Sequence, residues 1–197
     1  MAMIHTLVEG LMDEAVAAKI IKAAGHIPGT SYGLRGCGYV KKKVRSYNLS
    51  AKSTFYLTLI DLMDTSEECA PEVVTRWVPD REPKMLFRIV IREIESWLIA
   101  DREGIAQFLR IDLLKVPAMP EQLADPKFEL IRLARRSRNK SIREALVPEP
   151  DSFAIVGKLY TSEMIRFIGT QWNIQNARVN APSLEKCLLR LEEIPPD

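Results

Sequence analysis

The chain has 197 residues, of which 47% are hydrophobic and 27% are charged, and its formal net charge is +2. This length suits one domain, or one domain with a helical extension, and the apolar fraction is ample for a buried core. The composition excludes several classes of protein. No apolar run approaches the roughly 20 residues of a membrane span. Two histidines are too few for a usual zinc site, and both a GxSxG serine elbow and a Walker lysine loop are missing.

The three cysteines, Cys37, Cys69 and Cys187, lie far apart and form no CxxC pair. This spacing favours reduced thiols over a disulfide framework. We also expect no signal peptide, because the first apolar run begins at once and is interrupted by Glu9. The sequence therefore predicts a cytoplasmic protein with no membrane partner.

The first half of the chain alternates predicted strands with predicted helices. Strands are indicated by short runs of aromatic and branched residues, and helices by apolar residues at a period of 3.6. In chain order these are a strand at 3–8, a helix at 11–24, a weaker strand at 27–32, a glycine-rich turn at 33–38, a basic helix at 39–47, a strand at 54–60, a helix at 67–77, a strand at 85–91 and a helix at 92–100. This alternation predicts a parallel sheet with right-handed crossovers.

The second half of the chain shows only helical patterns. They lie at 102–109, 126–136, 140–146, 159–170 and 183–193, separated by prolines. Trp77, Trp97, Trp172 and Tyr160 sit in apolar helical company and are predicted to pack in the core. We therefore expect an α/β fold with a mostly parallel sheet flanked by helices. Residues 1–101 would form its α/β core, and 102–197 a helical extension packed on that core as one structural domain.

Acidic residues follow two of the predicted strands where those strands end. Glu9 closes the first strand and precedes Gly10, whereas Asp61 and Asp64 follow the strand at 54–60. The carboxyl ends of parallel strands form the ligand crevice of an α/β sheet. Carboxylate oxygens are the ligands that Mg²⁺ or Mn²⁺ prefers. Glu9, Asp61 and Asp64 are therefore the predicted metal ligands.

Other acids have structural alternatives. Asp13 and Glu14 fall in the first turn of the predicted helix at 11–24, where acids are typical because of the helix dipole. One of Asp61 and Asp64 could instead cap the next helix.

Glu93 and Glu95 follow the strand at 85–91, and one of them could complete the acidic cluster. On an extended chain the two side chains share a face. On a helix they point about 200° apart. Spacing alone leaves both open, and Glu93 is the candidate that we assign to proton transfer.

Basic residues gather in two stretches, 35–52 and 132–143, that contain no acid. Between them, residues 61–72 contain several acids and no base. This pattern suits a polyanion backbone held around a metal, although a solvated helix face is the simpler reading. The glycines at 33–38 could expose backbone N–H groups to a phosphate, or could form only a turn. The predicted nucleic-acid contacts are Arg35, Lys41, Lys42, Lys43, Arg135, Arg136 and Arg138.

These motifs resemble a known family. Val8-Glu9-Gly10, together with an acidic pair after a hydrophobic strand, resembles the Toprim fold of topoisomerases, primases and nucleases of the overcoming-lysogenization-defect type. More narrowly, the chain is similar to a family of small bacterial Toprim-like proteins of unassigned function. The marks of this likeness are the Val-Glu-Gly opening, the run Arg92–Asp101, Asp125-Pro126-Lys127, and Ser183-Leu184 with Leu188 and Leu191.

The resemblance implies a role for each acidic residue. Glu9 would act as general acid or base and touch the metal, while Asp61 and Asp64 would hold Mg²⁺. The usual Toprim pair is Asp-x-Asp, but this chain reads Asp61-Leu62-Met63-Asp64, so one carboxylate is displaced. The resemblance also implies an ATPase partner of the ABC or SMC-like kind, as in phage-defence systems.

The combined prediction is a Mg²⁺-dependent phosphodiesterase or nuclease that acts on nucleic acid with an ATPase partner, in phage defence or DNA maintenance. Metal would polarise the phosphoryl oxygen and activate water, and Glu9 or Glu93 would move the proton. The alternative is a catalytically inactive adaptor that docks on the ATPase, with the altered acidic pair as a trace of lost chemistry. A small-molecule phosphohydrolase is a third possibility.

Overall fold

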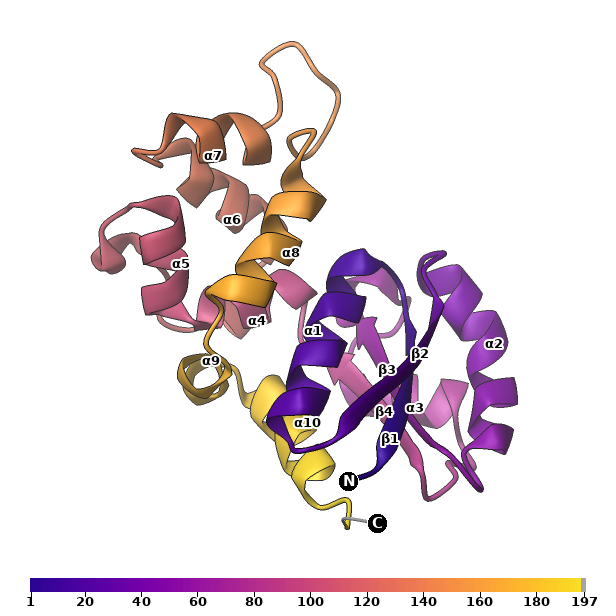
Figure 1. Cartoon of the computed structure of the whole chain (residues 1–197). Helices are drawn as coiled ribbons and strands as arrows, with labels where there is room; N and C mark the ends of the chain where they lie inside the picture. The colour runs from indigo at the N-terminus through magenta and orange to yellow at the C-terminus, as the bar shows by residue number, and fades with distance from the viewer. Residues whose placement is uncertain (196–197) are drawn as a thin grey trace. The chain divides into compact units, whose positions relative to one another are not determined.

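The computed structural model describes residues 1–195 (Figure 1). Its sheet has four parallel strands in the order β2-β1-β3-β4. The strands are β1 (Met3–Val8), β2 (Ile27–Gly33), β3 (Phe55–Asp61) and β4 (Met85–Val90). This confirms the predicted α/β class, including the weaker second strand, and is consistent with a Toprim-like fold. The central strands β1 and β3 are rich in buried apolar residues because helices cover both faces of the sheet.

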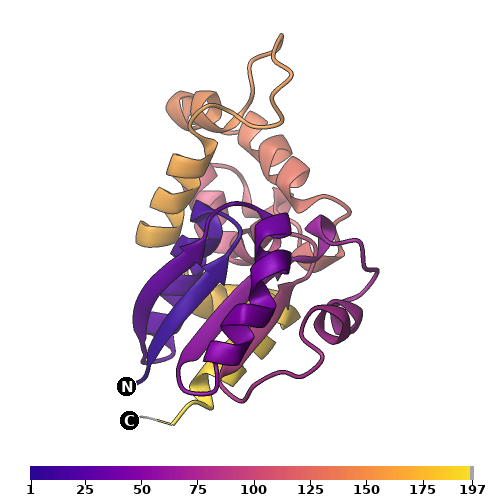
Figure 2. The same cartoon turned by 90° about the vertical axis from the view of Figure 1, so that its right-hand side faces the viewer.

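Helices flank the sheet on both sides (Figure 2). They are α1 (Leu11–Ala23), α2 (Cys37–Ser50), α3 (Ala70–Trp77) and the end of α10 (Pro182–Glu192). The α2 and α3 face packs Val40, Val44 and Trp77 against Leu7 and Phe87. On the opposite face lie α1 and α10, and the buried His26 Nε2 bonds to the carbonyl of Leu191 in α10 at 2.9 Å. Within unit 1 the sheet therefore lies between two helical layers.

Two helices begin later than the sequence predicts. The helix expected at 67–77 starts only at Ala70, because Cys69 is its N-cap and Pro71 occupies its first turn. The helix expected at 92–100 starts at Ile94, because Arg92 has a left-handed φ of 69° and Glu93 is extended. The basic helix expected at 39–47 begins earlier than predicted, because α2 starts at Cys37.

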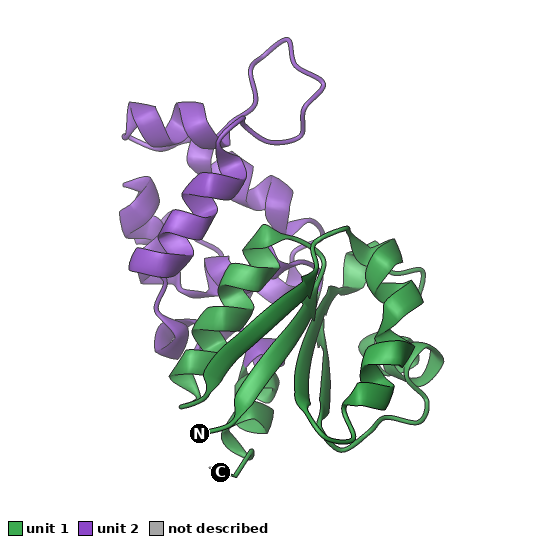
Figure 3. Cartoon of the chain, turned by 45° about the vertical axis from the view of Figure 1, so that its right-hand side comes forward, with its two compact units in different colours: residues 1–91, 185–197 green, residues 92–184 purple. Residues whose placement is uncertain are grey.

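The described chain divides into two compact units (Figure 3). Unit 1 is Met1–Ile91 with Glu185–Asp197 and holds the sheet; unit 2 is Arg92–Leu184 and is helical. The helix α10 belongs to unit 1 from Glu185 onward. Every helix within residues 1–195 is too short or too polar to span a lipid bilayer.

Unit 2 confirms the predicted helical second half. Its helices are α4 (Ile94–Ala100), α5 (Arg102–Leu109), α6 (Pro126–Arg135), α7 (Lys140–Leu146), α8 (Tyr160–Thr170) and α9 (Ile174–Asn180), with short 3₁₀ turns at Leu113–Lys115 and Pro120–Gln122. Helix α4 is buried along its whole length. Trp97 and Trp172 pack in the core as predicted, and Trp172 Nε1 donates to the carbonyl of Trp97 at 3.1 Å.

Candidate active site

The structure brings Glu9 and Asp61 together at the carboxyl edge of the sheet. Glu9 directly follows β1, and Gly10 then caps α1. Asp61 is the last residue of the neighbouring strand β3. Because the two strands are parallel, both residues reach the same edge, and the Asp61 amide donates to Glu9 Oε1 at 3.1 Å. This hydrogen bond fixes the orientation of the Glu9 carboxyl group.

Asp64 joins the same cluster through a short turn. Residues Leu62–Asp64 form a 3₁₀ helix with Asp61 as its N-cap. Since a 3₁₀ helix has three residues per turn, positions 61 and 64 lie on the same side. Asp64 is close enough to Glu9 for its charge to raise the pKa of the Glu9 carboxyl group. The turn thus explains how the wider Asp-x-x-Asp spacing still places an acid beside Glu9, and neither aspartate caps α3.

Asp13 has both a structural role and a place near Glu9. Its Oδ2 accepts from the Gly10 amide at 3.0 Å, as expected for an acid at a helix start. Its negative charge also acts on Glu9. Glu9, Asp13 and Asp61 are each at most 9% exposed, whereas Asp64 is exposed. The cluster is therefore buried on one side and open at Asp64.

The electrostatics of this cluster favour a protonated Glu9. Burial raises the pKa of Glu9 to about 8; the Asp61 amide opposes this, and the charges of Asp64 and Asp13 add to it. The same acidic residues also act on Cys37, at the start of α2. Burial, then the charges of Glu9 and Asp64, raise the pKa of its thiol to about 12. These shifts favour the protonated form of Glu9 at neutral pH when no cation is present.

The donor chemistry of the cluster suits a hard cation. Within residues 1–195 no group of three or more His, Cys, Asp or Glu side chains is arranged to hold a metal ion. Magnesium, however, is usually held by one or two carboxylates, with water and phosphate oxygens completing its shell. Glu9 and Asp64 provide such a carboxylate pair, provided that Glu9 first loses its proton.

The glycine-rich turn lies against the end of β1. The amide of Leu34 donates to the carbonyl of Val8, and the amide of Gly36 donates to the carbonyl of Glu9, each at 3.0 Å. Gly33 has a φ of 99°, and a Cβ there would lie 2.2 Å from the Val8 carbonyl oxygen. Only glycine allows this close approach. Helix α2 therefore begins beside Glu9.

The predicted basic contacts fall into different settings. Arg35 is exposed in the glycine-rich turn, 5.4 Å from the centre of the Tyr39 ring, and Lys42 and Lys43 are exposed on α2. Lys41 is exposed as well, but its Nζ lies 3.8 Å from Glu67 Oε1 and 5.0 Å from the centre of the Trp77 ring. In unit 2, the residues Arg135, Arg136 and Arg138 are exposed at and beyond the end of α6.

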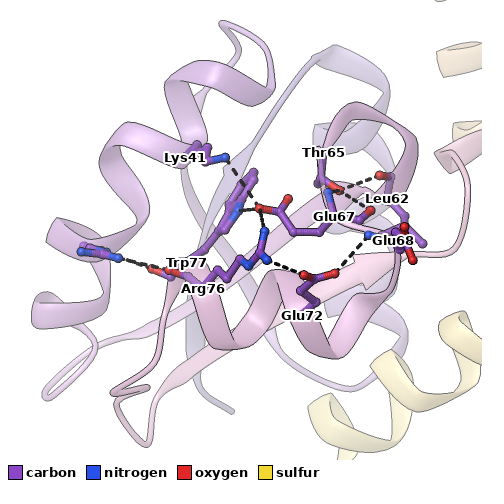
Figure 4. A network of polar contacts seen from close by, with 9 residues as sticks. Lys41, Leu62, Thr65, Glu67, Glu68, Glu72, Arg76 and Trp77 are labelled. Carbon is purple, nitrogen blue, oxygen red and sulfur yellow. Dashed lines mark hydrogen bonds and ion pairs between the residues drawn. The ribbon is translucent and has the colours of Figure 1, made fainter.

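Glu67 and Glu72, from the acid-rich stretch 61–72, serve helix packing (Figure 4). Glu67 Oε1 accepts from Trp77 Nε1 at 3.4 Å and lies 3.8 Å from both Lys41 Nζ and an Arg76 nitrogen. Arg76 also pairs with Glu72 at 2.7 Å. Burial acts to raise the pKa of Glu67, but the Trp77 bond and the Lys41 charge hold it below its ordinary value. Glu67 therefore connects α2 to α3, whereas Glu72 pairs with Arg76 within α3.

In unit 2, Glu93 and Glu95 both point at one lysine. Lys127 donates from its amide to Glu93 Oε2 at 3.0 Å and from Nζ to Glu93 Oε1 at 2.8 Å. Its Nζ also lies 3.6 Å from Glu95 Oε1, which accepts from the Tyr160 hydroxyl at 2.9 Å. Asp125 positions the lysine by capping α6. The spacing left open whether Glu93 or Glu95 would join the acidic cluster. In the structure both side chains face Lys127 in unit 2.

Sequence reasoning missed this cluster. Burial raises the pKa of Glu95 to about 7, although Lys127 and the Tyr160 hydroxyl oppose the shift. Tyr160 is buried as predicted, but its hydroxyl has a polar role that helical periodicity does not reveal. The available signal was Asp125-Pro126, a helix start that fixes Lys127 in the first turn of α6.

Comparisons of the chain with known protein families, with curated proteins and with solved structures find no match. Membership of the Toprim-like family therefore stays a prediction from the sequence motifs. The functional argument depends on the fold and on the side chains gathered at the carboxyl edge of the sheet.

Proposed function

We propose that the chain is a Mg²⁺-dependent phosphodiesterase of the Toprim type that cleaves nucleic acid. The observation that carries this proposal is the meeting of Glu9, Asp61 and Asp64 at the carboxyl edge of β1 and β3. Glu9 and Asp64 would hold the cation, with Asp61 beside them. When bound, Mg²⁺ or Mn²⁺ supplies Lewis-acid polarisation of a phosphoryl oxygen and a more acidic water.

Glu9 is suited to proton transfer in such a site. A general acid or base works best when its pKa lies near the operating pH, and the pKa of Glu9 is about 8 when no cation is bound. The Asp61 amide holds the carboxyl group in place, so little reorganisation is needed when the proton moves. Glu93, the other residue that the sequence suggests for proton transfer, belongs to unit 2, where two hydrogen bonds from Lys127 orient it.

Exposed cations on unit 1 would hold the nucleic-acid backbone. Arg35 lies in the turn that packs against Glu9, and Lys42 and Lys43 follow on α2. Such contacts bind phosphates without reading base sequence. By the family resemblance, we propose that an ABC or SMC-like ATPase works with this protein, in phage defence or DNA maintenance.

A nuclease assay with a matched variant tests the proposal. Purified protein is incubated with DNA or RNA, with Mg²⁺, Mn²⁺ or a chelator. We expect cation-dependent cleavage that falls roughly 10²-fold or more in Glu9→Gln. Glu14→Gln, in the first turn of α1, is the control and should keep full activity. Cleavage by a folded Glu9→Gln protein at the wild-type rate would remove the mechanism.

A non-catalytic adaptor is the second candidate function. The observation that favours it is the lack, within residues 1–195, of a three-ligand group for a metal. Calorimetric titration with Mn²⁺ separates the two readings without an activity assay. Heat of binding that is lost in Asp64→Asn supports the enzyme. Absence of any binding heat supports an adaptor, whose sheet would serve only to dock on the ATPase.

A further inference from the structure

Unit 1 contains a cavity of about 330 Å³ that lies apart from the Glu9 cluster. It opens beside the edge strand β4, and its walls come from the start of β3, residues 81–88 and the end of α10. Phe55 begins β3 at this cavity, whereas Asp61 ends the same strand at the acidic cluster. The six residue-to-residue steps from Phe55 to Asp61 span roughly 20 Å. The side chains that matter here are Phe55, Arg81, Lys84, Arg88, Arg190 and Ile194.

Arg88 is the unusual residue of this cavity. It is the only charged residue in the strand Met85–Val90, and it lies on the sheet face that α10 covers. One terminal nitrogen donates to the carbonyl of Lys186 at 3.3 Å, which anchors the guanidinium. Its Nε is buried and has no hydrogen-bond partner within residues 1–195. A buried donor without an acceptor is costly, so the protein satisfies this guanidinium only in part.

The charge around Arg88 has one sign. Among residues 1–195, four basic residues line the cavity against one acid, Glu193, which is a formal excess of three positive charges. Glu193 pairs with Arg190, and Lys84 Nζ donates to the carbonyl of Ser53 at 2.8 Å. Within residues 1–195 neither Arg81 nor Arg88 has an acidic partner in an ion pair. Burial, and then the charges of Arg190 and Arg81, lower the pKa of Arg88, as expected for cations gathered without enough anion.

We propose that this cavity binds the phosphate group of a phosphomonoester. Arg88 lines the cavity, and the fixed N–H groups of a guanidinium recognise phosphate oxygens directionally. The excess of positive charge suits a dianion better than a single carboxylate. The cavity volume is at the lower end of that for small-ligand sites, and Phe55 and Ile194 offer apolar surface to the organic part. The ester is either a small molecule or the phosphorylated end of a nucleic acid.

Calorimetry without divalent cations, at pH 8 and low salt, tests the site. The probes are inorganic phosphate, phenyl phosphate, and an oligonucleotide with either a 5′-phosphate or a 5′-hydroxyl. We expect phenyl phosphate or the 5′-phosphorylated oligonucleotide to bind about tenfold tighter than inorganic phosphate or the 5′-hydroxyl form. Tighter binding of phenyl phosphate assigns the site to a small molecule. Tighter binding of the 5′-phosphorylated oligonucleotide assigns it to a nucleic-acid end. Equal binding of all probes, or none, would overturn the proposal.

Variants connect binding to the cavity. Arg88→Lys keeps the charge but loses the guanidinium fork, and should weaken binding about tenfold. Arg81 is exposed, so Arg81→Gln keeps the fold and should also weaken binding, about threefold. Lys22→Gln, on α1 and outside the cavity, is the control of equal charge change. Unchanged affinity in Arg81→Gln and Arg88→Lys would refute the site. Failure here leaves the Glu9 proposal untouched.

Discussion

Among single residues, Glu9 couples the stability of the chain to pH. Its pKa is about 8 in the folded chain, against an ordinary value of 4.5. Between these values the folded state holds a proton that the unfolded state releases. This contribution to the free energy of unfolding is complete below about pH 4.5 and is lost as pH rises through about 8. The protein without metal should therefore become less stable from pH 5 to pH 9.

Glu9→Gln should remove most of this pH dependence, because an amide does not ionise. Solvent at the rim of the cluster screens part of the effect, so we expect the variant to gain roughly 2 kcal/mol relative to wild type between pH 5 and pH 9. Urea unfolding at both pH values, with a chelator present, measures it. Glu14→Gln serves as control. Parallel pH profiles for wild type and Glu9→Gln would show that Glu9 is not protonated in the fold.

Tyr160 is a second single residue whose contact affects both stability and a carboxyl pKa, in this case that of Glu95. Its hydroxyl donates to Glu95 Oε1 at 2.9 Å inside a buried cluster. Tyr160→Phe removes this donor and should lower the free energy of unfolding by about 1–3 kcal/mol. It should also raise the pKa of Glu95 above its value of about 7, because the hydrogen bond favours the charged form. Urea unfolding and a carbon-detected NMR titration measure the two effects; Tyr39→Phe is the control, and no change in either would contradict the cluster.

At the level of elements, helix α10 completes the core of unit 1 from the far end of the chain. Leu191 is 0% exposed, while Leu189, in the same helix, is 45% exposed. Leu191→Ala should therefore cost about 2–5 kcal/mol in the free energy of unfolding. Leu189→Ala should change it by about 0.5 kcal/mol or less. Urea unfolding compares the two variants, and equal effects would mean that α10 does not pack as described.

The strands could be predicted because their apolar runs are local and distinctive. Once the strand ends were known, parallel pairing of the strands was enough to place Glu9 and Asp61 at the same edge of the sheet. The helix α9 was not predicted, and its start depends on the Asn173 side chain, which accepts from the amides of Gln175 and Asn176. Arg88 was missed for a related reason. The burial of this arginine depends on contacts with α10, which is far away in the sequence, so the apolar strand pattern alone does not reveal it.

For the whole molecule, sequence periodicity reports local structure but not which unit a helix joins. The strand pattern predicts a core at 1–101 and a helical extension at 102–197. The compact units divide at Ile91 and Arg92, and the chain returns to unit 1 at Glu185. That return depends on contacts between residues far apart in sequence, such as His26 with Leu191. Whether the predicted segments fold as one structural domain stays a prediction.

Charge is the property of the whole chain that bears on its proposed substrate. The net charge of +2 gives little long-range attraction, so nucleic-acid binding would depend on local cations. Lys42 and Lys43 are exposed on α2, whereas Lys41 lies 3.8 Å from Glu67 and 5.0 Å from the centre of the Trp77 ring. A phosphate contact by Lys41 would have to compete with these partners. The three neighbouring lysines are therefore not equivalent.

This difference predicts the salt dependence of binding. On duplex DNA each phosphate contact contributes about 0.9 to the slope of log affinity against log salt concentration. The double variant Lys42→Gln, Lys43→Gln should reduce that slope by about 2, and Lys41→Gln by less than about 0.5. Fluorescence anisotropy with labelled DNA between 50 and 200 mM salt, at a fixed low Ca²⁺ concentration, gives each slope. A lysine that contacts a phosphate releases a counterion, whichever residues carry out cleavage. Equal slopes for the wild type and both variants would therefore mean that the DNA does not contact these lysines.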